Sequence, residues 1–204
     1  KKISGVKPGL NNIESFKNTN VIIDFTVPKC TIEILKIATK LKKRVVIGTT
    51  GLSNKQLKKI EYASKHATII KSGNMSLGVN LLETLVRQAA SKLDTSFNIQ
   101  INEEHHKHKI DAPSGTALML GNAAAKGRNL KLDKVKKISR LNTKGSHSKD
   151  KIVFTSFRKG ETVGNHEVIF SSPDEIINFK HKANNRGIFA SGAIYAVKWG
   201  QDKK

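Results

Sequence analysis

Short apolar runs alternate with longer amphipathic stretches through the first half of this 204-residue chain. Three of the runs have the β-branched composition of buried parallel strands: residues 21–25, 45–47 and 67–70. Between them, residues 31–41 and 53–65 carry apolar side chains at helical spacing. Pro28 suits the first turn of one helix and Ser53 the N-cap of the other. Because strands linked in this order pair in parallel through right-handed crossovers, the pattern predicts part of a doubly wound α/β sheet.

The pattern changes near residue 77. Helices are predicted over residues 77–93, 117–125 and 189–199, and a strand over residues 97–101. Alternating apolar residues predict an antiparallel meander over residues 152–157, 163–170 and 175–179, and a loop is expected within residues 122–149. We therefore expect two domains in an α/β chain. Residues 1–75, with residues 187–204 returning to them, form a partial doubly wound α/β domain. Residues 76–186 form an α+β domain with a mostly antiparallel or mixed open sheet.

Composition excludes several classes of protein. No apolar run approaches the ~18 residues that a membrane-spanning helix needs. Cys30 is the single cysteine, so no intramolecular disulfide forms. A reducing compartment is the simplest fit, and we expect a cytoplasmic protein.

The net charge of +21 raises the alternative of a nucleic-acid-binding module. Only six of the 37 basic residues are Arg, and aromatic residues make up 5% of the chain. Nucleic-acid readers rely on Arg for bidentate contacts and on aromatic side chains for stacking. Nucleic acid is therefore the less favoured partner.

The densest chemical signal lies between residues 103 and 117, which read EEHHKHKIDAPSGTA. His105 and Lys109 are four residues apart, and we expect them on one side of the segment, where they can donate protons or hold a carboxylate. The following Ser-Gly-Thr, which includes Gly115 and Thr116, offers backbone N–H groups at a helix N-terminus, where anions bind. These features predict an acidic small-molecule ligand. A metal site is the weaker alternative, because the adjacent His105 and His106 cannot both face inward from a regular strand or helix.

Three loops follow three successive predicted strands. They contain Asp24, the run Gly48, Thr49 and Thr50, and the run Ser72, Gly73, Asn74 and Met75. Ligands of open α/β sheets bind at the carboxyl ends of the strands. These loops are therefore candidate cofactor contacts.

The motifs together resemble the 4-hydroxy-tetrahydrodipicolinate reductase (dihydrodipicolinate reductase) family. The His-rich run resembles the signature of that family, and four further motifs occur in family order: IDFTVP at 23–28, VIGTTG at 46–51, GNMSLGVNLL at 73–82 and RGIFASGA at 186–193. The resemblance implies NADPH- or NADH-dependent reduction of a cyclic unsaturated dicarboxylate in the diaminopimelate and lysine pathway. It also implies that residues 1–75, with residues 187–204, form a partial Rossmann-like dinucleotide-binding domain. Residues 76–186 would then form the substrate-binding and oligomerisation domain, and homotetramers are expected to form through the sheets of that domain.

Roles follow from the resemblance by motif position. His105 resembles the acid/base of the family and Lys109 its proton donor, while His106, Gly115 and Thr116 resemble groups that hold a substrate carboxylate. Gly48, Thr49 and Thr50, with the run from Ser72 to Met75, resemble the loops that line the dinucleotide. No metal is implied.

The family opens with a strand and a Gly-rich phosphate loop. Gly5 and Gly9 lack the spacing and the preceding strand of such a loop, so we expect this chain to lack about the first quarter of the family's length and a short tail. An inactive fragment that acts only through association is therefore a third hypothesis. Binding of a dinucleotide distinguishes it from the reductase.

Overall fold

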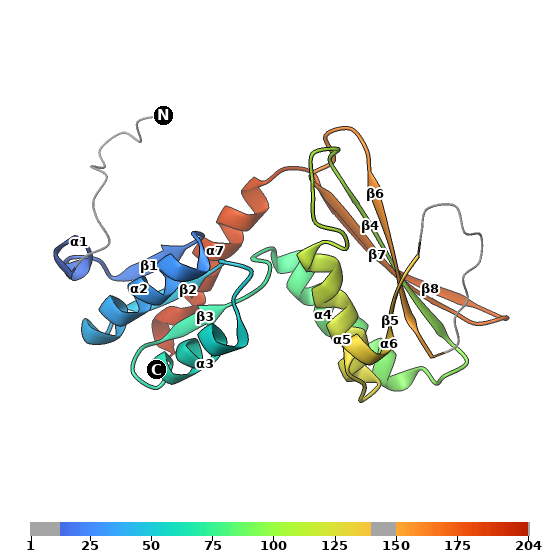
Figure 1. The fold of residues 1–204 in the computed structure, drawn as a ribbon, viewed down its shortest axis with the longest axis horizontal. Coiled ribbons are helices and arrows are strands. Elements are labelled where there is room, and N and C mark those ends of the chain that lie inside the picture. Colours follow the sequence, from blue (N-terminus) through green and yellow to red (C-terminus); the bar gives the residue numbers. More distant parts are fainter. Residues whose placement is uncertain (1–12, 140–149, 204) are drawn as a thin grey trace. The chain divides into compact units, whose positions relative to one another are not determined.

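The computed structural model describes residues 13–139 and 150–203 (Figure 1). The chain divides into two compact units. Unit 1 comprises Lys1–Gly73 and Gly192–Lys204, and unit 2 comprises Asn74–Ser191. The expected loop within residues 122–149 lies partly outside the described residues, as do Gly5 and Gly9.

Unit 1 is built on a three-stranded parallel sheet. Its strands are β1 (Val21–Asp24), β2 (Arg44–Ile47) and β3 (Ile69–Lys71), in the order β1-β2-β3. Its helices are α1 (Ile13–Lys17), α2 (Pro28–Lys40) and α3 (Asn54–Ala63). Apolar side chains of α2, α3 and the strands share one buried cluster, so both crossover helices cover the same face of the sheet. The predicted parallel α/β pattern is confirmed.

The helix-start signals act as predicted. Pro28 occupies the first turn of α2. Ser53 caps α3 through a capping box with Gln56, in which the hydroxyl of Ser53 accepts from the backbone N–H of Gln56. The third strand begins two residues later than predicted, because the backbone N–H of Ala67 still donates to the carbonyl of Ala63 at the end of α3.

Unit 2 contains a five-stranded mixed sheet in the order β5-β6-β4-β7-β8. The strands are β4 (Asn98–His105), β5 (Lys136–Ile138), β6 (Ile152–Arg158), β7 (Gly164–Ser171) and β8 (Ile176–Ala183). The predicted meander is therefore wrong in its first step, since β4 lies between β6 and β7 and runs parallel to β6. Alternation identifies which strands face a core and carries no information about their order. The hairpin of β7 and β8 is antiparallel, as predicted.

Helices cover one face of this sheet. They include α4 (Leu77–Lys92), α5 (Gly115–Gly127) and the short α6 (Leu132–Val135), and α4 and α5 share a buried cluster with the strands (Figure 1). Helix α5 extends two residues beyond the predicted helix at each end, so the expected loop begins later. Gly127 allows α5 to approach α4, because a Cβ there would lie 2.4 Å from the carbonyl oxygen of Arg87. Helix α7 (Gly187–Trp199) and a 3-10 turn (Gly200–Asp202) end the described chain.

Candidate active site

The inner face of the unit 2 sheet changes from apolar to polar toward one end. Along β4, side chains on the inner face alternate with those on the outer face, and Ile99, Ile101, Glu103 and His105 are all buried. The register extends this change across the neighbouring strands. One polar row reads Ser156, Glu103, His166 and His181, and the next reads Arg158, His105, Gly164 and Ala183. The polar end of the sheet is therefore built by four strands.

Glu103 lies at the centre of the polar rows, with 2% of its surface exposed. Its Oε2 accepts a hydrogen bond from Nδ1 of His105 over 2.5 Å, and Arg158 pairs with both of its oxygens at 2.9 and 3.1 Å. Burial alone would raise the pKa of Glu103, but the hydrogen bonds from His105, Arg158 and Ser156 outweigh burial and lower the pKa to about 2. An ionised Glu103 thus orients the His105 ring.

His166 packs beside this pair. Its ring lies edge-on to the ring of His105, with centroids 5.0 Å apart, and its Nε2 lies 3.1 Å from the hydroxyl of Ser114. The pKa of His166 is lowered to about 3, mainly by burial and in the same direction by the nearby His105. His166 is therefore neutral at neutral pH, and it lines the site beside His105 and Ser114. Gly164 leaves room for His105, since a Cβ there would lie 3.0 Å from Nε2 of His105.

The loop after β4 carries Lys109. The expectation of one regular segment from His105 to Lys109 is wrong, because β4 ends at His105 and the chain then turns, with the backbone N–H of Lys109 donating to the carbonyl of His106. The ammonium of Lys109 lies 2.6 Å from Oδ1 of Asp111, and 21% of its side chain is exposed. Lys109 is therefore held by one partner and accessible to a ligand. The ring of His106 lies near that of His108, with centroids 6.2 Å apart.

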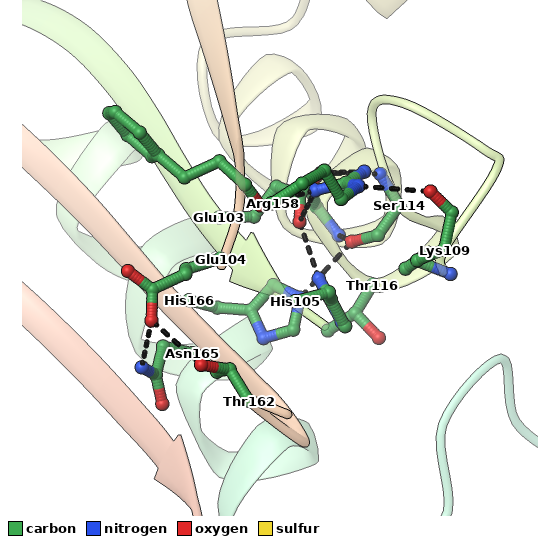
Figure 2. A network of polar contacts seen from close by, with 12 residues as sticks. Glu103, Glu104, His105, Lys109, Ser114, Thr116, Arg158, Thr162, Asn165 and His166 are labelled. Atoms are coloured by element: carbon green, nitrogen blue, oxygen red, sulfur yellow. Dashed lines mark hydrogen bonds and ion pairs between the residues drawn. The ribbon is translucent and has the colours of Figure 1, made fainter. Parts of the chain in front are cut away.

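The N-terminus of α5 adjoins these groups (Figure 2). Ser114 is the N-cap: its hydroxyl accepts from the backbone N–H of Ala117, and its own N–H donates to Glu103 over 3.3 Å. Across the described residues, the backbone N–H groups of Gly115 and Thr116 have no acceptor. Gly115 is exposed, and a Cβ there would meet nothing within 4 Å. The predicted helix start is confirmed, and two of its backbone N–H groups point to no acceptor among the described residues.

Asn74 joins the starts of the two helices. Its amide donates to the hydroxyl of Thr116 over 2.9 Å, and its Oδ1 accepts from the backbone N–H of Ser76. Ser76 is the N-cap of α4, and its hydroxyl accepts from the backbone N–H of Val79. Met75, between them, is buried.

The other predicted cofactor contacts lie in unit 1 at the carboxyl ends of its strands. Thr49 is buried, and its hydroxyl accepts from the backbone N–H of Thr26 over 3.1 Å. Gly48 packs against the ring of Phe25, where a Cβ would collide, and Thr50 is exposed. Gly48 and Thr49 therefore fix the conformation of the loop after β2 through their contacts with Phe25 and Thr26.

The segment after β3 joins this group through its backbone. The N–H of Ser72 donates to the carbonyl of Ile47 over 3.3 Å, which ties the start of the Ser72–Gly73 loop to the end of β2. At the end of β1, the carboxylate of Asp24 accepts from the hydroxyls of Thr26 and Thr31, which connects the strand to the following loop and to α2.

The described residues contain no cluster of three or more His, Cys, Asp or Glu side chains that could hold a metal ion. Among the described helices, none is both long enough and apolar enough to span a membrane.

Glu103, Arg158 and His166 are site residues that sequence reasoning assigned no role. Glu103 stands two residues before His105, and a strand period would have placed both on one face. Arg158 and His166 arrive through pairing of strands distant in the sequence, for which the sequence has no local signal.

Comparisons with known proteins agree with this geometry. Residues 4–75 match the family model for the N-terminus of dihydrodipicolinate reductase, and residues 78–204 match the model for its C-terminus. The chain is 52% identical to the 4-hydroxy-tetrahydrodipicolinate reductase of Pelagibacter ubique over its whole length, which covers 79% of that relative. It is 46% identical to the enzyme of the same name from Ruegeria pomeroyi, covering 94% of this chain and 71% of that one.

A solved structure shows the same fold. The dipicolinate-bound dihydrodipicolinate reductase from Paenisporosarcina sp. TG-14 superposes with a TM-score of 0.73 at 26% identity, covering 92% of this chain and 72% of the other. Both halves of the chain match, in the family's order, and the polar end of the unit 2 sheet carries its His-rich signature. The chain belongs to the dihydrodipicolinate reductase family.

Proposed function

We propose that the chain catalyses the reduction of 4-hydroxy-tetrahydrodipicolinate to tetrahydrodipicolinate by NADPH or NADH in diaminopimelate and lysine biosynthesis. The observation that carries the proposal is the cluster of Glu103, His105 and Lys109 beside the N-terminus of α5. One cluster thereby offers proton donors and anion-binding N–H groups. A ring dicarboxylate that gains a proton during reduction needs both.

Each group has a role in the proposal. The N–H groups of Gly115 and Thr116 bind one substrate carboxylate, and the neighbouring His106 adds a further polar contact. Lys109 supplies the proton, and His105, oriented by Glu103, acts as the acid/base. Hydride and proton enter the substrate, water leaves, and the nucleotide is released oxidised, so that atoms and charge balance.

The pyridine nucleotide is proposed to bind at the carboxyl ends of β1, β2 and β3, where doubly wound sheets hold nucleotides. The loops at these strand ends would contact the nucleotide mainly through their backbone. Asp24 and Thr49 both accept from Thr26, which fixes the loop after β1 against the loop after β2. When bound, the nucleotide supplies hydride. Gly48, Thr49 and Thr50 with Ser72, Gly73, Asn74 and Met75 are the proposed contacts, and the proposal covers NADPH and NADH equally.

The proposed assembly is a homotetramer in the cytoplasm. The proposed contact surface between subunits is the outer face of the unit 2 sheet, on the side opposite α4 and α5. Its side chains include the exposed Phe157 and Lys180 and the half-buried Asn102, Glu104 and Glu167. Light scattering of the purified protein measures the oligomer directly, and a monomer at micromolar concentration would contradict this part of the proposal.

The activity is tested with the longest form of the protein that its gene encodes. Loss of nicotinamide absorbance is followed with freshly generated substrate, with NADPH and NADH in parallel. Substrate-dependent oxidation of at least one nucleotide is expected. The competing nucleic-acid hypothesis rests on net charge alone, and it predicts instead DNA binding that weakens steeply with salt.

A further inference from the structure

Arg158 ends β6 beside the candidate active site, and its guanidinium connects two parts of that site. We propose that Arg158 is a positioning residue that fixes the geometry between His105 and Lys109. The inference rests on the proposed function, since it assigns to the proton-donating pair a shared support. Figure 2 shows Arg158 between Glu103 and the loop that carries Lys109.

Every donor of the guanidinium has an acceptor. A guanidinium carries five N–H donors in a fixed plane. Nη1 and Nη2 donate to the two oxygens of Glu103 at 3.1 and 2.9 Å. The other three contacts go to backbone carbonyls: Nε to Lys109 at 3.2 Å, Nη1 to Phe157 at 2.6 Å and Nη2 to Asp111 at 2.7 Å.

One side of this arrangement orients His105. Glu103 accepts from Nδ1 of His105 with the same oxygen that accepts from Nη1 of Arg158. Since the carboxylate is buried and accepts from His105, Arg158 and the backbone of Ser114, its rotation is restricted. Arg158 therefore holds the ring of His105 indirectly, through Glu103.

The other side holds the loop after β4. The carbonyls of Lys109 and Asp111 both accept from Arg158, and the side chains of the same two residues form the 2.6 Å ion pair. The backbone on both sides of residue 110 is thus fixed by one planar group. His106 is held separately, because the next residue, Lys107, donates to the carbonyl of Gly160.

Full occupancy of its donors also separates Arg158 from direct contact with the substrate. An Arg next to an acidic ligand is the usual candidate for a carboxylate clamp. Here a carboxylate would have to displace Glu103 or a backbone carbonyl from Arg158. Arg158 therefore acts through the residues that it holds.

Arg128 offers a matched control. Its Nη2 donates to the backbone carbonyls of Asp94 and Phe97 at 3.0 and 2.6 Å, within the same unit. It is an Arg that supports backbone and contacts none of the proposed catalytic groups. Arg128→Lys and Arg158→Lys both replace a planar fork by a single ammonium, so comparing them separates positioning from general structural support.

The experiment compares Arg158→Lys, Arg158→Ala and Arg128→Lys with the parent in the longest encoded form. For Arg158→Lys we expect a fall in kcat of about 10²-fold, the usual cost of misplacing a catalytic group by about 1 Å, with substrate KM changed less than about threefold. Added guanidinium ion at millimolar, non-denaturing concentration is expected to restore part of the activity of Arg158→Ala. Arg128→Lys is expected to retain the parent kcat while losing stability towards urea.

Amide hydrogen exchange of residues 106–113 provides a readout that needs no turnover. Arg158→Lys is expected to speed exchange in this segment, and Arg128→Lys is expected to leave it unchanged. The proposal is overturned if Arg158→Lys keeps kcat within threefold of the parent, if Arg128→Lys loses as much kcat, or if exchange is the same in both variants. A parent without activity contradicts the proposed function, whereas the exchange comparison still decides whether Arg158 fixes the loop.

Discussion

Replacing Glu103 by Gln tests the centre of the candidate site with almost no change in shape. Oε1 of Glu103 accepts from Ser114 and Arg158, and Oε2 accepts from His105 and Arg158. Whichever way the Gln amide is turned, its NH₂ group faces two donors. The substitution also leaves the charge of Arg158 without its partner.

Two independent estimates give the magnitude. Removing one partner of a buried ion pair costs about 3–5 kcal/mol. Holding the pKa of Glu103 at about 2, against an ordinary value of 4.5, corresponds to about 3 kcal/mol of stability at neutral pH. Because the folded-state pKa is lowered, this contribution is complete above pH 4.5 and is lost as the pH falls through 2. About half of it remains at pH 3.

The assay is urea unfolding of parent and variant at pH 7 and at pH 3. We expect Glu103→Gln to lower the free energy of unfolding by about 3 kcal/mol at pH 7 and by about half as much at pH 3. Glu104→Gln is the control, since in the described part of the chain the carboxylate of Glu104 accepts from the neutral Thr162 and Asn165, and its loss should stay below about 1 kcal/mol. A Glu103→Gln variant as stable as the Glu104→Gln variant at pH 7 would show that the buried contacts of Glu103 do not stabilise the fold.

Three further predictions concern single residues. Lys109→Met should lower kcat by ~10²–10⁴ because a proton donor is lost, with folding intact by circular dichroism; turnover within threefold of the parent would exclude that role. Thr49→Val removes the acceptor for the N–H of Thr26 and should weaken nucleotide binding more than dipicolinate binding in calorimetric titrations; equal losses would count against it. His166→Gln should reduce the acid sensitivity of folding. Since burial lowers the pKa of His166 to about 3, the unfolded chain binds more protons below pH 6.5, and the parent should lose about 2 kcal/mol between pH 7 and pH 5 in urea titrations. An unchanged slope in the variant would contradict this.

Much of the fold could be predicted because its signals are local. The capping residue Ser53 and the turn residue Pro28 act within one helical turn, and the apolar runs of unit 1 are linked by short crossovers whose handedness is fixed. The order of the unit 2 strands could not be predicted. The pairing of β4 between β6 and β7 depends on contacts between residues more than 40 positions apart.

The candidate site divides in the same way. His105, Lys109 and the start of α5 lie within one short segment, so motif and helix-start chemistry pointed to them. Arg158 comes from a distant strand and carries an ordinary charge in a Lys-rich chain. The register of β6 against β4 places Arg158 opposite His105, and from there its guanidinium reaches Glu103.

Isotope transfer shows whether hydride passes from the nucleotide to the substrate ring. The longest encoded form of the protein is incubated with substrate and with NADPH or NADH deuterated at the transferable position, and the mass of the product is measured. We expect a tetrahydrodipicolinate product that carries one deuterium from the nucleotide. A product without deuterium, or no product with either nucleotide, would rule out the proposed reduction.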